Sequence, residues 1–127
     1  MKSYTDLEQS KKLAEILPLI TADMDYIPIV NLDGEYSPSV NVWDNEHITD
    51  EGWIPAWSLA SLLNYLREID FFPEIEANEH GVTMSINYYD EKEVRPLAPV
   101  HNIKVKTESF IDACYEMILH LHEQKIL

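Results

Sequence analysis

The chain has 127 residues, of which 46% are hydrophobic and 25% are charged, and its formal net charge is −14. This composition fits one globular domain with an ordinary apolar core and excludes a wholly disordered chain. The single cysteine excludes an intramolecular disulfide and a cysteine metal cluster. Because no apolar run approaches the roughly 20 residues that span a bilayer, and the first residues do not read as a signal peptide, we expect a soluble cytoplasmic protein without a membrane partner.

The negative charge is concentrated in one continuous segment. Residues 13–91 contain sixteen Asp and Glu and one basic residue, Arg67, whereas both flanking segments are near balance. Nucleic acid and anionic lipid need Lys and Arg to neutralise their phosphates, so we expect no direct binding of nucleic acid. A protein partner with a basic surface is the favoured class of partner.

The first predicted element is a helix that begins near Thr5. Thr5 and Glu8 form a capping-box pattern, and apolar residues follow at helical spacing as far as Leu17. Pro18 cannot continue a helix, so we expect the helix to end there.

A β-hairpin is predicted next. Its strands cover residues 26–32 and 36–43, and between them lies Asp33-Gly34, a dipeptide that two-residue type I′ turns prefer. Pro28 and Pro38 cannot donate a hydrogen bond to a neighbouring strand, which favours edge positions for both strands.

An acidic loop, residues 44–52, separates this hairpin from a second predicted helix over residues 55–67. Pro55 suits the first turn of a helix, where its missing N–H is not needed. The helix is amphipathic, and its apolar face consists of Leu59, Leu62, Leu63 and Leu66.

A second hairpin is predicted from residues 71–76 and 82–89, with the turn at residues 78–81. The return strand alternates: its apolar positions face one way and its polar positions face the other. The apolar set is Val82, Met84, Ile86 and Tyr88.

The chain is predicted to end with a strand over residues 100–106 and an amphipathic helix over residues 108–124, capped by Thr107 or Ser109. Together the elements predict an α+β fold in a single globular domain, residues 1–127. We expect an antiparallel sheet of about four to five strands, including two hairpins, packed by three helices.

Three segments resemble a known family. Residues 55–63 read Pro-Ala-Trp-Ser-Leu-Ala-Ser-Leu-Leu and are similar to a WSLxALLxLL helix signature, and the chain from Asp112 to Glu123 is similar to a DAxxEMxxxL ending. The opening from Asp6 to Glu15 is similar to the start of some members. The family consists of small uncharacterised proteins of gut anaerobes and their phages and mobile elements. The resemblance implies a small single-domain protein with helices packed on an antiparallel sheet, and it assigns no catalytic residue.

The acidic loop and its two flanking tryptophans are the predicted interaction surface. Exposed aromatic side chains beside charge are typical of protein-binding surfaces. The carboxylates of the loop do not have the spacing of an EF-hand, so a dedicated metal site is not expected. The candidate surface consists of Trp43, Asp44, Glu46, His47, Asp50, Glu51 and Trp53.

No catalytic, cofactor-binding or metal site is predicted. His120 and His122 are two residues apart on one helix and lack the i, i+4 spacing of a zinc helix motif. Cys114 lies on the apolar face of the last helix, which indicates a buried and inert thiol. Asp112 and Glu116 are interpreted as solvated carboxylates near a helix N-terminus. Three glycines are too few for a Gly-rich phosphate loop.

Three functional hypotheses follow from these observations. The favoured one is a non-catalytic interaction protein of phage or mobile-element origin. No recognisable set of catalytic residues is present, and the chain combines an acidic segment with three Trp and seven Tyr. The alternative is an acidic decoy of nucleic acid, which presents carboxylates where a DNA-binding protein expects phosphates. The third is a small hydrolase-type enzyme that uses carboxylates or His. It predicts a concave pocket with at least two convergent titratable groups.

Overall fold

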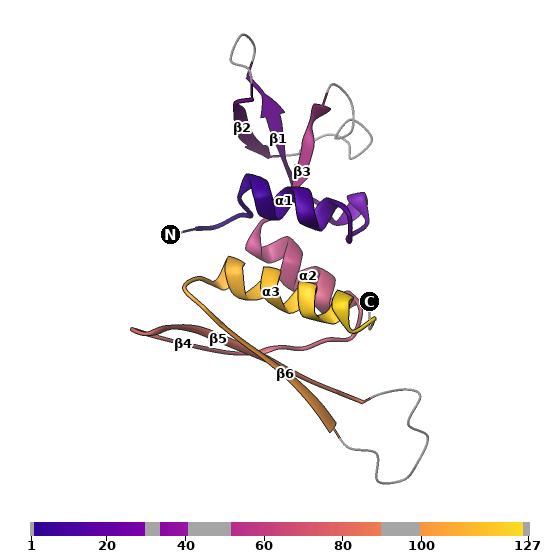
Figure 1. The fold of residues 1–127 in the computed structure, drawn as a ribbon, viewed down its shortest axis with the longest axis vertical. Coiled ribbons are helices and arrows are strands. Elements are labelled where there is room, and N and C mark those ends of the chain that lie inside the picture. The colour runs from indigo at the N-terminus through magenta and orange to yellow at the C-terminus, as the bar shows by residue number, and fades with distance from the viewer. Residues whose placement is uncertain (1, 30–33, 41–51, 90–99, 126–127) are drawn as a thin grey trace.

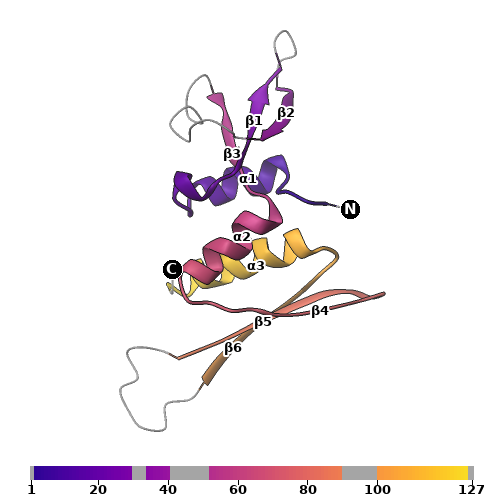
Figure 2. The same ribbon diagram turned by 180° about the vertical axis from the view of Figure 1, so that it is seen from behind.

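The computed structural model describes residues 2–29, 34–40, 52–89 and 100–125. In this part of the chain, three α-helices, one short 3-10 helix and six strands are present. The strands form two antiparallel sheets, ordered β2-β1-β3 and β4-β5-β6. The helices lie between the two sheets (Figures 1 and 2). The elements are α1 (Leu7–Ala14), η1 (Leu19–Thr21), β1 (Met24–Pro28), β2 (Tyr36–Val40), β3 (Ile54–Ala56), α2 (Leu59–Glu68), β4 (Glu74–Asn78), β5 (Gly81–Tyr89), β6 (Val100–Thr107) and α3 (Phe110–Glu123).

The α+β class and the three helices are confirmed, but the strands divide into two sheets instead of one. The first sheet contains an unpredicted strand, β3, which occupies the place where the sequence predicts the start of a helix. Asp25 of β1 lies opposite Pro55 of β3. Pro55 is acceptable there because β3 is at the edge of its sheet, where proline can occur in a strand. The helix begins later, where the Ser58 side chain accepts a hydrogen bond from the Ser61 N–H.

The first helix also begins at a different residue from the one predicted. Asp6 is the N-cap and forms a capping box with Gln9, and the helix ends at Ala14, before Pro18. Thr5, the predicted cap, is fully buried and takes part in a network that joins three elements.

The first hairpin forms, but its register is not that of an Asp33-Gly34 turn. Pro28 lies opposite Tyr36, and the Ile29 N–H donates to the Glu35 carbonyl oxygen at 2.9 Å. A two-residue turn at positions 33 and 34 would place position 32 opposite position 35, which differs from this register. Strand β1 is also the central strand of its sheet, so the predicted edge position holds only for β2.

The second hairpin has its turn at the predicted residues 78–81, but β4 begins at Glu74, later than the predicted residue 71. Asn78 pairs with Gly81, so the turn has two central residues, and the Asn78 side chain accepts from the His80 N–H at 2.8 Å. Gly81 has φ +132°, and a Cβ there would lie 2.5 Å from the Thr107 carbonyl oxygen. Only glycine fits this position without moving backbone.

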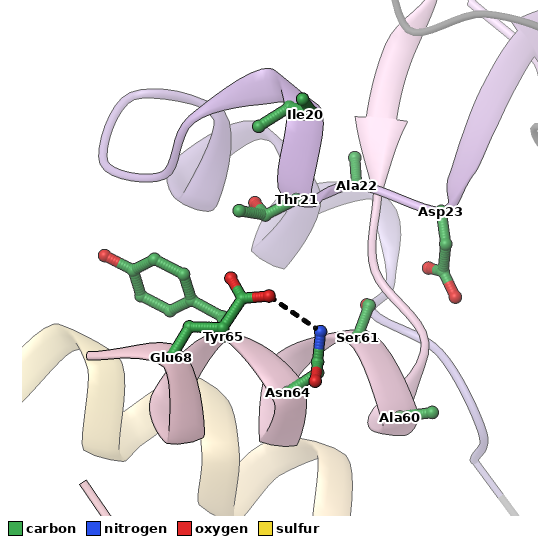
Figure 3. A pocket seen from close by; sticks show the side chains of 9 residues that line it. All are labelled: Ile20, Thr21, Ala22, Asp23, Ala60, Ser61, Asn64, Tyr65 and Glu68. Carbon is green, nitrogen blue, oxygen red and sulfur yellow. Dashed lines mark hydrogen bonds between the residues drawn. The ribbon is translucent and has the colours of Figure 1, made fainter. Parts of the chain in front are cut away.

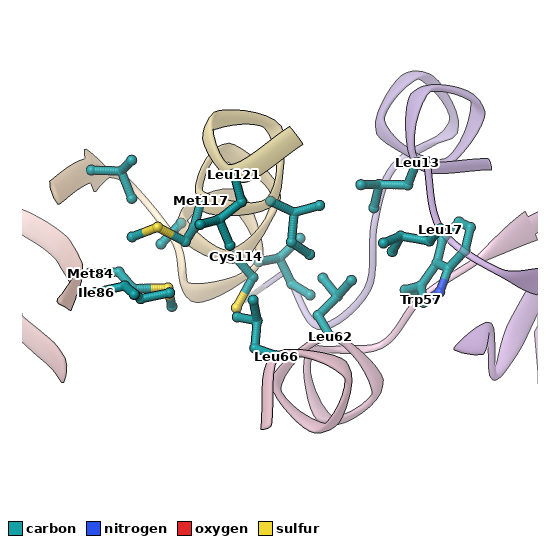
Figure 4. Close-up of a cluster of buried hydrophobic side chains, with 14 of the residues drawn as sticks. Leu13, Leu17, Trp57, Leu62, Leu66, Met84, Ile86, Cys114, Met117 and Leu121 are labelled. Carbon is teal, nitrogen blue, oxygen red and sulfur yellow. The ribbon is translucent and has the colours of Figure 1, made fainter. Parts of the chain in front are cut away.

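The apolar core joins the three helices to one face of the β4-β5-β6 sheet. Alternate residues of β5 and β6 face it, which confirms the predicted alternation, and Val82, Met84 and Ile86 are all nearly or fully buried. In Figure 4, Leu13, Leu17 and Trp57 lie at one end of the cluster, Met84 and Ile86 at the other, and Leu62, Leu66 and Cys114 between them. Each fully buried large side chain contributes roughly 1.5–3 kcal/mol.

Candidate functional site

A groove of about 600 Å³ lies between η1 and α2. One wall is the turn of η1 and the two residues after it, and the other wall is the outward face of α2 (Figure 3). Its lining residues are Ile20, Thr21, Ala22, Asp23, Ala60, Ser61, Asn64, Tyr65 and Glu68.

The α2 wall follows from the amphipathic pattern of this helix. Leu62 and Leu66 are fully buried in the core, so positions displaced from them by about half a turn point outward. Ser61, Tyr65 and Glu68 are spaced four and three residues apart along one flank of α2, where Ser61 and Tyr65 are half-buried and Glu68 is exposed. The sequence therefore places polar and acidic groups along this flank of α2.

The η1 wall is held by a hydrogen-bond relay from the core. The indole N–H of the buried Trp57 donates to Thr21 Oγ1 at 2.9 Å, and Thr21 Oγ1 donates to the Pro18 carbonyl oxygen at 2.6 Å. The Thr21 hydroxyl therefore acts as an acceptor and as a donor. The relay fixes η1 relative to the N-terminal end of α2.

Asp23 joins the two walls at one end of the groove. Its carboxylate accepts from the Ser58 N–H at 2.8 Å and from the Ser58 hydroxyl. Ser58 in turn caps α2 through the Ser61 N–H at 3.2 Å. A carboxylate that accepts two bonds near a helix N-terminus is also favoured by the helix dipole.

Glu68 and Asn64 lie at the other end of the groove. The Asn64 side-chain amide donates to Glu68 Oε1 at 3.2 Å, drawn as the dashed line in Figure 3. This bond orients the carboxylate, and within the described residues no hydrogen bond engages Glu68 Oε2. Burial raises the pKa of the neighbouring Tyr65 above its ordinary value.

The groove combines negative charge with an apolar lip. Asp23 and Glu68 are its two charged lining residues, and none of the lining residues is Lys, Arg or His. Ile20, on the η1 side, is 80% exposed, which is unusual for a large aliphatic side chain. The arrangement suits a cationic group flanked by apolar atoms.

The lining residues do not form a nucleophile and base pair. Ser61 Oγ donates to the Ser58 carbonyl oxygen at 2.8 Å, and the groove contains no His or Cys that would take its proton. The two oxygens of Asp23 are occupied in holding Ser58. The described lining residues therefore show no hydroxyl that is paired with a base.

The predicted interaction surface falls almost entirely outside the described residues. Trp53 is described: it is half-buried and directly precedes β3. The other candidates, which lie outside the described ranges, are Trp43, Asp44, Glu46, His47, Asp50 and Glu51. Sequence reasoning missed the groove because its two acidic ends are 45 positions apart in the chain, at Asp23 and Glu68. The sequence feature that could have indicated the groove is the row of polar residues on α2.

Asp112 is not the solvated carboxylate that the sequence predicts. Its Oδ1 accepts from Lys2 Nζ at 2.7 Å and from Gln9 Nε2 at 2.8 Å. Burial alone would raise its pKa, but hydrogen bonds from Lys2, Gln9 and Ser109 bring the pKa below the ordinary value. These bonds tie the N-terminal segment and α1 to α3.

Cys114 and Asp25 are buried titratable groups outside the groove. Cys114 is fully buried, as predicted, and burial raises the pKa of its thiol to about 12, so the thiol stays protonated. Asp25 of β1 is 3% exposed, and its Oδ1 has no hydrogen-bond partner among the described residues. Burial raises the pKa of Asp25 because the charged form is poorly solvated there.

The comparisons with known proteins give no indication of the function. No family model matches the chain, and no curated protein and no solved structure shows significant similarity to it. The resemblance to the family of gut anaerobes and their phages therefore stays a prediction. Among the described residues, no helix is both long and apolar enough to cross a membrane, and no group of three His, Cys, Asp or Glu is placed to hold a metal ion.

Proposed function

We propose that the protein is a non-catalytic interaction protein whose η1–α2 groove binds a partner protein through a cationic side chain next to an apolar one. One observation carries this proposal: two carboxylates and a highly exposed isoleucine line the same groove, and no lining residue is cationic. The three residues are Asp23, Glu68 and Ile20.

The cationic half of the ligand is best matched by arginine. A guanidinium group presents planar, paired donors that suit a carboxylate and a neighbouring amide oxygen. Asn64 holds Glu68 through one carboxylate oxygen, which leaves the other oriented toward a ligand. Because Glu68 is exposed, solvent screening limits its contribution to about 1 kcal/mol or less.

The apolar half of the ligand would cover Ile20 and the ring of Tyr65. Ile20 is 80% exposed, so most of its side chain is still available for burial on binding. Covering an aliphatic side chain of this size is favourable by roughly 1.5–2 kcal/mol. This term is larger than the exposed ion pair, so the apolar contact supplies most of the affinity and the ion pair supplies selectivity.

The net charge of −14 adds long-range attraction to such a partner. A basic partner is steered toward an acidic protein, and this steering raises the association rate and weakens as salt is added. The nucleic-acid decoy uses the same charge but requires a continuous array of carboxylates. The described acids lie on elements at opposite ends of the molecule, such as Glu35 next to β2 and Glu74 on β4 (Figure 1), and do not favour it.

The proposal is tested by mapping a peptide onto the protein by NMR. The probe is a short acetylated and amidated peptide with Arg beside Leu, and the matched control has citrulline, which is neutral and nearly isosteric, in place of Arg. At about 0.15 M salt, where long-range attraction is screened, we expect amide shifts confined to residues 20–23 and 60–68. The Arg peptide should bind about three- to tenfold more tightly than the citrulline peptide.

Three variants separate binding in the groove from an effect of general acidity. Glu68→Gln should weaken the Arg peptide about threefold, whereas Glu123→Gln, which removes the same charge from the exposed end of α3, should leave its affinity unchanged. Ile20→Ser should weaken both peptides. Shifts spread over the whole acidic surface, or equal effects of the two charge-removing variants, would refute binding in the groove.

A further inference from the structure

The β4-β5-β6 sheet has an open edge at β4. All five residues of β4 are exposed, and β5 is the only described strand that pairs with it. An edge strand leaves half of its backbone N–H and C=O groups pointing away from its sheet, ready to pair with another strand. The β4 end of the hairpin also extends past the N-terminus of α3 in both views (Figures 1 and 2).

The two faces of β4 have opposite chemistry. Glu74 and Glu76 lie opposite Ser85 and Thr83 of β5, on the face turned away from the helices. A hollow of about 220 Å³ lies on this face beside the edge. It is lined by Glu74, Ile75, Glu76, Thr83, Ser85 and Lys104.

The other face of β4 is apolar and incompletely covered. Ile75 lies opposite Met84, which lies opposite Val105, so the three residues form one row across the sheet. Met84 and Val105 are 0% and 6% exposed, but Ile75 at the edge is 38% exposed. The helical cover of the sheet therefore ends before the edge. Phe72, just before β4, is 69% exposed as well.

We propose that β4 accepts an added strand from a partner protein, an extended segment in which Lys or Arg alternates with apolar residues. The pleat sends alternate side chains of such a strand to opposite faces. Its basic residues would lie beside Glu74 and Glu76, and its apolar residues would cover Ile75. The backbone of β4 would supply the affinity common to strand addition, and the alternating chemistry would supply the specificity.

Charge decides between this occupant and a second copy of the chain. A second β4 placed against the first would bring the carboxylates of Glu74 and Glu76 near those of its partner, and like charges across a strand pair are destabilising. The net charge of −14 on each copy opposes the approach further. A basic strand meets no like charge on β4 itself, and Lys104 of β6 lies two strands away on the same face. This surface is separate from the η1–α2 groove, so the inference is independent of the proposed function.

The test uses two five-residue peptides of the same composition, acetylated and amidated: Lys-Val-Lys-Val-Lys, which alternates, and Lys-Lys-Val-Val-Lys, which does not. We expect the alternating peptide to shift and protect the amides of residues 74–78 of the full chain, measured by NMR and amide hydrogen exchange. The non-alternating peptide should bind several-fold more weakly, because its side chains cannot serve both faces. Equal binding of the two peptides, or shifts outside residues 74–78, would overturn the proposal.

A charge swap makes the test specific. Glu74→Lys/Glu76→Lys should weaken the alternating Lys peptide about tenfold or more and create affinity for Glu-Val-Glu-Val-Glu. Both residues are exposed, so circular dichroism and the melting temperature should stay near those of the wild type. Glu68→Gln should leave this binding unchanged, which separates the edge from the groove. A concentration-dependent dimer of the wild type that the charge swap abolishes would assign the edge to a second copy instead and would refute the proposal.

Discussion

Two three-stranded sheets enclose the helices, but different interactions join them to the rest of the molecule. The β4-β5-β6 sheet packs a mainly apolar face on the helices, with Met84 and Ile86 at 0% and 1% exposed. The β2-β1-β3 sheet places a carboxylate, Asp25, at a buried position of its central strand. It is joined to the helices through hydrogen bonds around one threonine.

Thr5 is the centre of that polar junction. Its backbone N–H donates to the Trp57 carbonyl oxygen at 2.9 Å, and its hydroxyl accepts from the backbone N–H of Trp57 at 3.1 Å. The hydroxyl also shares a 2.7 Å hydrogen bond with Ser10 Oγ, and the Tyr26 hydroxyl donates to the Thr5 carbonyl oxygen at 2.8 Å. Directional bonds of this kind fix orientation more than they add stability.

The comparison separates the interactions that stabilise the fold from those that orient its elements. Apolar burial supplies the free energy of folding in the larger core, and the polar junction sets the angle of the small sheet and of η1. The groove lies at the boundary, because Trp57 belongs to the core and also holds Thr21. Changes in the core are expected to unfold the protein, whereas changes at the junction are expected to alter the site.

The largest expected effect is in the core. Leu66→Ala removes a fully buried side chain between α2 and α3 and should lower the free energy of unfolding by about 2–5 kcal/mol, measured by urea denaturation. Ile20→Ala is the control, since Ile20 is 80% exposed and its truncation should have little effect. Equal losses in the two variants would contradict the assignment of the core.

A smaller effect is expected at the polar junction. Thr5→Val keeps the shape of the side chain but removes the hydroxyl, which leaves the Trp57 N–H without that acceptor. We expect a loss of about 1–3 kcal/mol in the free energy of unfolding, together with amide shifts in η1. Ser37→Ala, a hydroxyl removal at an exposed position of β2, is the control. A loss without any change near η1 would show that the junction stabilises but does not position.

The smallest effect concerns Asp25 and depends on pH. Burial raises its folded pKa above the ordinary value of 3.8, so the folded chain holds this proton more tightly than the unfolded chain. This contribution to stability is present below the unfolded pKa and is lost as the pH rises through the folded pKa. Asp25→Asn should therefore melt at a higher temperature than the wild type at neutral pH, and their difference should shrink in acid. Asp70→Asn, which removes the same charge at an exposed site, is the control for the loss of one carboxylate.

Periodicity made the larger core predictable from the sequence. The apolar stripe of α3 and the alternation of β5 both depend on burial, and burial dominates the choice of residue at those positions. The structure confirms Met84, Ile86, Cys114 and Met117 as buried.

The junction was not predictable in the same way, because it depends on pairings distant in sequence. Pro55 suits both a first helical turn and an edge strand, and only its place opposite Asp25 of β1 distinguishes the two. Thr5 and Asp6 are both good caps, and the choice between them depends on the buried contacts of Thr5 with Trp57. The groove was equally hard to predict. The sequence of η1 has no periodic pattern, and the position of η1 depends on the hydrogen bond from the Trp57 indole to Thr21.

The central claim is that the η1–α2 groove recognises a cation through Glu68, and a double-mutant cycle tests it most directly. The cycle compares the Kd of the Arg and citrulline peptides for the wild type and for Glu68→Gln by isothermal titration calorimetry. We predict that Glu68→Gln weakens the Arg peptide about threefold and leaves the citrulline peptide unchanged, which is the signature of a direct pair. An equal loss for both peptides, or a loss that Glu123→Gln reproduces, would contradict recognition by this groove.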